Sequence, residues 1–283
     1  MSFTPSIIAT LATGPAIKDL RVMLKSLEIF NANPPTVYLY CDTSIASAIP
    51  SLAYRGVLVH KVCLDHYAGL SRQIMELTPG KKFRNQWFDF MTEKITLIRW
   101  IFETDPVAST AGVMFCDADI CFMGPLPQIP VNTQVALSPH DIRLADEKRF
   151  GRYNGGFLWM SDSSFADIWW DSCKDARFYE QSALEDVADK ADSLYEFPIT
   201  ENYGWWRLCQ NVESPAVRAS EWGINRMKGG SGITVRGEPL GSVHTHFFQK
   251  GDAATSYFND LVKGFLKKLA DSHPPAKRIL AAL

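Results

Sequence analysis

The chain has 283 residues, enough for one large α/β domain or for a nucleotide-binding half with a smaller half attached to it. Its apolar fraction of 46% and charged fraction of 21% are typical of a globular protein and argue against extended disorder. The formal net charge of −2 excludes the overall basic field by which most nucleic-acid-binding proteins attract their ligand, so we expect no nucleic-acid partner.

No segment of the sequence has the pattern of an export signal or a membrane anchor. The apolar run at residues 7–11 lacks a positively charged leader, and no stretch approaches the ~18 apolar residues of a transmembrane helix. The six cysteines form no C-x-x-C pair, which argues against a zinc ribbon or a thioredoxin-type motif. We therefore expect a soluble, cytoplasmic protein with six reduced thiols.

Strand-like and helix-like segments alternate over residues 1–125. Apolar and β-branched runs predict strands, and apolar residues at helical spacing predict the helices between them. Such alternation predicts a mostly parallel sheet with helices on both faces, and ligands bind such sheets at the carboxyl ends of the strands. The predicted strands cover residues 7–11, 36–41, 56–62 and 112–116, and the predicted helices cover residues 20–30 and 92–102.

The pattern becomes irregular after residue 125. We expect one domain over residues 1–283, with a nucleotide-binding half (1–125), a donor-sugar and acceptor half (126–251) and a C-terminal amphipathic helix with a tail (252–283). A polar and aromatic stretch is predicted to cross the binding face, and a later one is rich in turns. These two stretches are residues 64–90 and 198–241.

Two aspartates directly follow the strand predicted over residues 112–116. Asp117 and Asp119 are separated by one residue, so their side chains point the same way while the chain stays extended. Together they can hold one hard divalent cation, whose other ligands would be water and diphosphate oxygens. A solvated acidic turn is the alternative, but desolvated carboxylates at the end of a buried strand repel each other unless a cation or partner is present.

The segment at residues 114–120, Met-Phe-Cys-Asp-Ala-Asp-Ile, and the following Pro125-Leu126 resemble the strand, D-x-D and P-L signature of GT-A glycosyltransferases. The similarity is greatest to the glycogenin-like and nucleotide-diphospho-sugar transferase groups. Three further segments resemble, in the same order, the N-x-G strand of the donor-sugar pocket, the D-Q-x-x-L helix start, and the C-terminal segment with a metal-binding His and a diphosphate-binding Lys. These segments are residues 153–160, 180–184 and 244–251.

This resemblance implies an α/β, Rossmann-like GT-A fold and a metal-dependent hexosyl- or pentosyltransferase. The donor would be a nucleotide-diphosphate sugar, with a UDP-sugar favoured over a GDP-sugar, and the acceptor a glycan or another hydroxyl compound. The implied cofactor is Mn²⁺ or Mg²⁺, held by Asp117, Asp119 and His246. His244 and His246 alternate and would face the same side of a strand, so His244 is a second candidate for the same role. It is the weaker of the two.

Several residues are predicted to contact the donor. Thr10, Ala12 and Asp42 lie at the carboxyl ends of the first two strands, where the base and ribose are expected, although Asp42 fits a helix N-cap equally well. Glycines allow close approach of a ligand, Asn offers a donor and an acceptor, and Lys can meet a phosphate. The further predicted donor contacts are Lys94 (or a solvated helix face), Ala118, Asn154, Gly155, Gly156 and Lys250.

The catalytic group stays open between several side chains. An inverting enzyme needs a carboxylate base, whereas a retaining enzyme needs a weak nucleophile or an electrostatic group beneath the sugar. The resemblance favours Gln181, with Glu180 and Asp186 as the other main candidates and Glu185 and Glu201 behind them. The stereochemical outcome therefore stays open as well.

Two other functions fit parts of the sequence. A sugar-phosphate nucleotidyltransferase would need a glycine-rich, basic loop after the first strand, and residues 11–15 contain one glycine and no basic residue. A non-catalytic carbohydrate- or metal-binding module would bind sugar without transferring it. The basic amphipathic helix near the C-terminus fits a weak peripheral contact with an anionic membrane, and fits better a docked helix with a solvated face.

Overall fold

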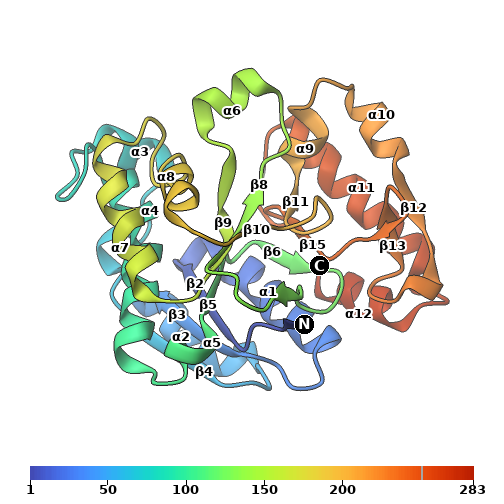
Figure 1. The fold of residues 1–283 in the computed structure, drawn as a ribbon. Helices are drawn as coiled ribbons and strands as arrows, with labels where there is room; N and C mark the ends of the chain where they lie inside the picture. The colour runs from blue at the N-terminus through green and yellow to red at the C-terminus, as the bar shows by residue number, and fades with distance from the viewer. Residues whose placement is uncertain (250) are drawn as a thin grey trace.

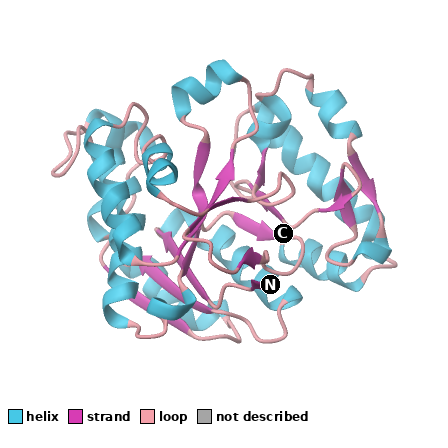
Figure 2. Cartoon of the chain, in the orientation of Figure 1, coloured by secondary structure: helices cyan, strands magenta, loops and turns pink. Residues whose placement is uncertain are grey.

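A seven-stranded sheet forms the centre of the protein, as the computed structural model of residues 1–249 and 251–283 shows (Figures 1 and 2). The strand order is β10-β8-β9-β5-β2-β3-β4. The strands are β2 (Ile7–Ala12), β3 (Thr36–Cys41), β4 (Leu58–Val62), β5 (Val113–Cys116), β8 (Val135–Pro139), β9 (Tyr153–Met160) and β10 (Leu194–Glu196).

The sheet is mostly parallel, as predicted. Only β9 runs antiparallel to its neighbours β5 and β8, whereas the other paired strands are parallel. Because β9 returns between β5 and β8, the polar residues at its start lie beside the end of β5. This places the predicted N-x-G strand next to the two aspartates.

Helices cover both faces of the sheet, because alternate strand residues point to opposite sides. Ile7 and Ala9 pack with α4, α7 and α8 in one core, whereas Ile8 packs with α1 and α2 in another. The helices of these two layers are α1 (Ile17–Phe30), α2 (Thr43–Leu52), α4 (Gln86–Thr104), α7 (Ser163–Ser172) and α8 (Leu184–Lys190).

A third core lies beside the sheet, in the lobe drawn in orange and red in Figure 1. It is built on the small sheet β11-β15-β6, with a second small sheet β12-β13-β14 at its edge. The elements of this lobe are β6 (Ile120–Phe122), β11 (Tyr203–Gly204), β12 (Trp222–Ile224), β13 (Ile233–Val235), β14 (Glu238–Pro239), β15 (Ser242–His244), α9 (Trp205–Cys209), α10 (Pro215–Ser220), α11 (Ala253–Ala270) and α12 (Pro274–Ala282).

The pairing of β15 with β6 brings the C-terminal histidine segment next to the segment that follows β5. His244 lies opposite Ile120 in this antiparallel pair, and β11 runs parallel to β15 on its other side. The C-terminal histidine segment and the start of β11 therefore both lie beside the segment that carries Asp117 and Asp119. The remaining short elements are β1 (Ser2–Phe3), β7 (Ile129–Pro130), α3 (Arg72–Leu77), α5 (Ala108–Ala111), α6 (Leu144–Phe150), η1 (Gly14–Ala16), η2 (Asp65–Tyr67), η3 (Cys173–Asp175) and η4 (Arg226–Lys228).

Two predicted irregular stretches contain more regular structure than expected. Helix α4 begins at Gln86, before the predicted residue 92, because Asn85 caps it by accepting a hydrogen bond from the Phe88 amide. The stretch of residues 198–241 contains short strands and helices whose lengths are too small to leave a period in the sequence.

The C-terminal amphipathic helix is docked. Phe258, Val262 and Leu266 of α11 are fully buried in the third core, while Lys267 and Lys268 are exposed.

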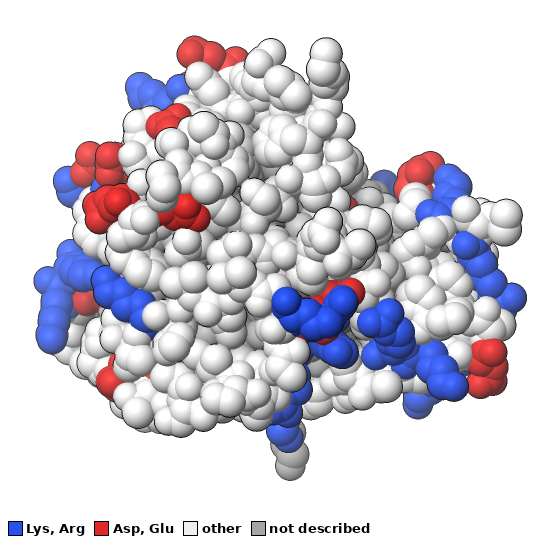
Figure 3. Space-filling view, turned by 90° about the horizontal axis from the view of Figure 1, so that it is seen from below, with Lys and Arg blue, Asp and Glu red and all other residues white. Residues whose placement is uncertain are grey.

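Figure 3 shows that Lys and Arg side chains form several separate groups on the underside of the molecule. No described helix combines the length and the apolar character needed to cross a membrane. A membrane contact stays a prediction. All six cysteines are free thiols.

Candidate active site

A cleft of about 660 Å³ opens where β2 and β5 end, at the carboxyl edge of the parallel strands. One part of its wall is charged and the rest is mainly apolar and aromatic. The charged part contains Lys94, Asp117, Asp119, His244 and His246. The apolar and aromatic part includes Leu11, Ala12, Tyr67, Leu70, Met75, Trp87, Phe90 and Met91.

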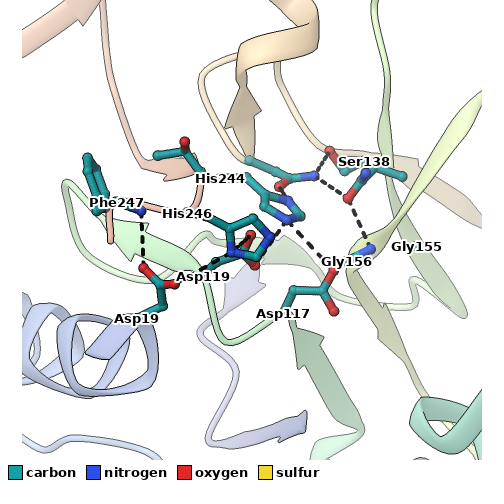
Figure 4. Close-up of polar contacts among 12 residues, drawn as sticks. Asp19, Asp117, Asp119, Ser138, Gly155, Gly156, His244, His246 and Phe247 are labelled. Carbon is teal, nitrogen blue, oxygen red and sulfur yellow. Dashed lines mark hydrogen bonds and ion pairs between the residues drawn. The ribbon is translucent and has the colours of Figure 1, made fainter. Parts of the chain in front are cut away.

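Asp117, Asp119 and His244 converge at the charged part of the cleft (Figure 4). The His244 Nε2 atom lies 3.2 Å from Asp119 Oδ1 and 3.7 Å from Asp117 Oδ2. The backbone fixes this arrangement: the Asp117 amide donates to the Gly156 carbonyl at 2.8 Å, and the Ile120 amide donates to the Asp117 carbonyl at 3.1 Å. The three side chains therefore meet through a tight turn after β5 and the strand pair β6-β15.

This donor set fits a divalent cation. One ligand atom from each of the three residues lies within 4.8 Å of the others, and two carboxylates with one imidazole suit Mn²⁺ better than Ca²⁺. The other ring nitrogen of His244, Nδ1, lies 2.8 Å from Asn202 Oδ1, so Nε2 is the nitrogen that faces the carboxylates.

His246 lies on the other side of Asp119 (Figure 4). Its Nδ1 atom is 3.4 Å from Asp119 Oδ2 and 3.5 Å from Asp19 Oδ2. Burial lowers the pKa of His246, but the two carboxylates outweigh this effect and raise it to about 9, so Nδ1 carries a proton at neutral pH. The ligand atoms that lie within 4.8 Å of one another are those of Asp117, Asp119 and His244. The geometry thus favours His244, the weaker candidate from the sequence, and a metal-binding role of His246 stays a prediction.

Lys94 is buried rather than solvated, so the alternative of a solvated helix face is wrong. Its Nζ atom donates to Glu180 Oε1 at 2.8 Å and to the Gly155 carbonyl at 3.1 Å, and it lies 3.7 Å from Asp117 Oδ1. Burial disfavours the ammonium, but the charges of Asp117 and Glu180 outweigh it and raise the pKa of Lys94. Lys94 therefore stays charged and offsets part of the repulsion between the aspartates.

Asn154 uses its whole amide group inside the protein. Its Oδ1 atom accepts from the Gly156 amide at 3.0 Å and from Asn202 Nδ2 at 3.1 Å. Its Nδ2 atom faces His140 Nε2 and Gln181 Oε1, each at 3.4 Å. Asn154 is thus placed to organise the pocket wall, and its predicted donor contact stays a prediction.

The two glycines after Asn154 leave room for different neighbours. A Cβ atom on Gly156 would lie 2.2 Å from Asp117 Oδ2 and 2.6 Å from His244 Cε1. A Cβ atom on Gly155 would lie 2.8 Å from Glu180 Oε1. Gly156 is therefore required for the close approach of β9 to the carboxylates.

The three catalytic candidates occupy different surroundings. Gln181 donates from Nε2 to the Phe150 carbonyl at 2.9 Å, and its Oε1 accepts from the Gly155 amide at 3.3 Å. Glu180 is buried against Lys94. Asp186 is exposed on α8. The described residues that line the cleft include none of the three candidates.

The other predicted donor contacts are divided. Ala12 and Ala118 line the cleft. Thr10 is fully buried, and its hydroxyl has no hydrogen-bond partner among the described residues. Asp42 caps α2 by accepting from the Ile45 amide at 2.9 Å, and its second oxygen accepts from the Gly14 amide at 2.8 Å. Lys250 lies outside the described residues.

The sequence analysis missed two residues of the site. Asp19 is buried in the first turn of α1, and its Oδ1 atom accepts from the Phe247 amide at 3.1 Å (Figure 4). Asn202 is buried at the start of β11 and contacts His244. Neither residue belongs to a local motif, and their partners lie far along the chain, so no sequence signal identifies them.

No family model matches the chain, and no curated protein matches its sequence. Solved structures do match. LgtC, a galactosyltransferase in complex with donor and acceptor sugar analogues, is 12% identical with a TM-score of 0.51, over 90% of this chain and 94% of that chain. A similar match is an active-site mutant of LgtC in which glutamate replaces a glutamine, with the same TM-score of 0.51 and 12% identity. The protein has the GT-A glycosyltransferase fold.

Two further glycosyltransferases are similar at lower coverage or lower score. The apo form of GlyE from Streptococcus pneumoniae TIGR4 is 13% identical with a TM-score of 0.51, and the match covers 94% of this chain but 64% of GlyE. Mouse xyloside xylosyltransferase 1 in its apo form is 10% identical with a TM-score of 0.44, over 71% of this chain and 88% of that one. The matches with a TM-score of 0.51 establish the GT-A fold. Because their sequence identities are this low, the argument for function depends on the residues of the cleft.

Proposed function

We propose that this protein is a metal-dependent glycosyltransferase that moves a sugar from a nucleoside-diphosphate sugar, with a UDP-sugar favoured, to a hydroxyl group of a glycan or another acceptor. The observation that carries this proposal is the convergence of Asp117, Asp119 and His244 in the cleft at the carboxyl ends of the parallel strands. Ligands of open α/β sheets bind at this edge, and the donor set suits Mn²⁺ or Mg²⁺.

The charged wall of the cleft has the groups needed for departure of a diphosphate. A divalent cation, when bound, supplies positive charge that stabilises the leaving nucleoside diphosphate. The Lys94 ammonium lies 3.7 Å from Asp117 Oδ1 and supplies one positive charge. Protonated His246 supplies a second positive charge at the cleft wall. These groups would orient the diphosphate and leave the anomeric carbon of the donor sugar exposed to the acceptor.

Gln181 is our candidate for the group beneath the donor sugar. Its amide is held by the Phe150 carbonyl and the Gly155 amide, so it is fixed beside the glycine segment of β9. The active-site mutant of LgtC also replaces a glutamine, which supports a glutamine role in a protein of this fold. A fixed amide oxygen suits electrostatic stabilisation of positive charge on the sugar.

The apolar part of the cleft is proposed to receive the nucleoside and the acceptor. Leu11 and Ala12 lie at the end of β2, where the base is expected, while Trp87 and Phe90 contribute aromatic rings to the lining. The complex of LgtC with both donor and acceptor sugar analogues supports a shared cleft for the two substrates.

The test is a panel of UDP- and GDP-sugars with Mn²⁺, in which release of nucleoside diphosphate and sugar transfer are measured. We expect release from at least one UDP-sugar and its loss in EDTA. Asp119→Asn should lower the rate by about 1,000-fold, because several kcal/mol of leaving-group stabilisation are lost. Its melting temperature should stay near that of the wild type. Full activity of Asp119→Asn in EDTA would contradict the proposal.

A further inference from the structure

We propose that Asn202 is a positioning residue that fixes His244 as the tautomer with a proton on Nδ1, and so directs the Nε2 lone pair at the two aspartates. The inference rests on the proposed metal-dependent function for its purpose. Its geometry depends only on hydrogen bonds among buried residues.

The identity of each amide atom follows from a backbone group. The Gly156 amide can only donate, so the Asn154 atom 3.0 Å from it is the oxygen Oδ1. The Asn202 side-chain atom 3.1 Å from that oxygen must therefore donate, which makes it Nδ2. The same Nδ2 group donates to Ser138 Oγ at 3.0 Å. The orientation of the Asn202 amide is thus set by its neighbours.

The remaining atom of the Asn202 amide decides the state of the ring. Its Oδ1 atom lies 2.8 Å from His244 Nδ1, and an amide oxygen only accepts, so Nδ1 carries the proton. In a neutral ring Nε2 is then unprotonated, and it faces Asp119 Oδ1 at 3.2 Å and Asp117 Oδ2 at 3.7 Å. Three lone-pair-bearing atoms that face one another repel, and a cation between them removes the repulsion.

Asn202 is held in place by its own backbone and by its surroundings. It is fully buried, its φ angle of 53° is in the left-handed region that asparagine tolerates, and its amide donates to Ser242 Oγ at 2.7 Å. On a different side, the Trp206 ring lies edge-on to the His244 ring with centroids 5.0 Å apart. The ring of His244 is therefore restricted by packing as well as by the hydrogen bond.

The contrast with His246 supports a specific role. The Nδ1 atom of His246 faces the carboxylates of Asp19 and Asp119 and, unlike that of His244, contacts no side-chain amide oxygen among the described residues. Of these two histidines, His244 is the one with Nδ1 bonded to a neutral acceptor and Nε2 directed at the acidic pair in the described structure. A partner of this kind is the usual way in which a ligating histidine is oriented.

The experiment uses the full chain labelled with ¹⁵N-histidine, and it begins without metal or nucleotide. Long-range ¹H–¹⁵N NMR reports which ring nitrogens carry protons, and a His244→Gln variant identifies the His244 signal. At a pH where the ring is neutral, we expect a proton on Nδ1 of His244 and none on Nε2 in the wild type. An unprotonated Nδ1 would overturn the assignment, whatever the enzyme does.

Two substitutions of Asn202 then separate positioning from packing, with Mn²⁺ binding measured by electron paramagnetic resonance. Asn202→Gly tolerates the backbone angle and removes the acceptor, so the affinity for Mn²⁺ should fall by about 10–100-fold. Asn202→Asp tolerates the same angle and keeps an acceptor for Nδ1–H but loses the donor to Asn154 and Ser138, so its affinity should fall less than that of the Gly variant. Ser138→Ala removes one acceptor from Asn202 and leaves its bond to His244, so its affinity should stay within about threefold of the wild type.

Equal losses in the Gly and Asp variants, or no loss in the Gly variant, would overturn the positioning role. The proposed function fails separately: a wild-type protein that has the Nδ1 proton but binds no Mn²⁺ would contradict metal dependence while supporting the tautomer assignment.

Discussion

Two clusters of buried polar side chains lie side by side at the carboxyl edge of the sheet, and they differ in how fully their polar atoms are paired. In the amide cluster around Asn154 and Asn202, the oxygen and nitrogen of both side chains have partners at 2.8–3.4 Å. In the acidic cluster around Asp119, the carboxylates face imidazoles at 3.2–3.7 Å, and Asp19 Oδ2 has no hydrogen-bond partner among the described residues.

This difference in hydrogen-bond pairing indicates that the amide cluster is a structural support and that the acidic cluster is a candidate binding site. A buried polar group without a partner costs free energy, so a protein keeps one mainly where a ligand will complete it. The amide cluster needs nothing more and orients its neighbours. In the acidic cluster we propose that a cation bound by Asp117, Asp119 and His244 removes the repulsion between the carboxylates.

The largest effect is expected at Lys94, which connects the two clusters. Lys94→Met removes the only ammonium near the buried Glu180 carboxylate in the described structure and should lower the free energy of unfolding by about 3–5 kcal/mol, because an unpaired buried charge remains. Thermal and urea unfolding measure this loss.

Two controls decide whether the loss comes from charge pairing. Lys94→Met combined with Glu180→Leu should recover much of the stability, since no charge is left unpaired. Lys174→Met breaks an exposed pair with Asp171 and should leave the stability close to that of the wild type. A double variant no more stable than Lys94→Met alone would show that Lys94 acts through packing.

The glycines of β9 give the next largest effect and separate the clusters directly. Gly156→Ala places a methyl group against Asp117 and His244, so the metal ligands must move and transfer should fall by about 100-fold. Gly155→Ala meets Glu180 instead and should mainly reduce stability, by about 1–3 kcal/mol. Rates and melting temperatures of both variants test this, and equal rate losses would remove the distinction between the clusters.

A pH-dependent effect is expected at Glu201, the carboxyl group beside the amide cluster. Burial raises its pKa to about 8, although the Ser242 hydroxyl and the Arg207 charge oppose this. Because the unfolded chain has a glutamate pKa of about 4.3, the native state holds the proton longer. Stability from this group is therefore complete below about pH 4 and falls as the pH rises toward 8.

Glu201→Gln cannot ionise, so its stability relative to the wild type should rise by about 2 kcal/mol between pH 4.5 and pH 6, and by more toward pH 8. Unfolding curves at several pH values give the comparison. Parallel pH profiles for variant and wild type would show that Glu201 does not titrate in this range.

Local patterns in the sequence predicted the sheet and the two aspartates. The strands near residues 7, 36 and 112 have short apolar runs, and Asp117 and Asp119 follow one of them directly, so their position at the sheet edge needs no distant information. The two histidines show where such reasoning ends. Strand alternation would put both on one side, but β15 ends at His244, and His246 lies in the following loop.

Residues that depend on long-range pairing could not be predicted. Asp19 meets the amide of Phe247 across 228 positions of sequence, and Asn202 meets His244 only because β11 pairs with β15. The register of such short strands leaves no periodic pattern. The helix cap at Asp42 is local and was one of the two roles that the sequence allowed.

The most direct test of the account is a crystal structure with Mn²⁺ and UDP, in which anomalous scattering locates the manganese. We predict one anomalous peak within about 2.5 Å of oxygens of Asp117 and Asp119, of His244 Nε2, and of the diphosphate. His246 Nδ1 should instead remain against Asp19. A peak bound by His246 Nδ1, or UDP bound in the cleft with no manganese at the aspartates, would contradict the account.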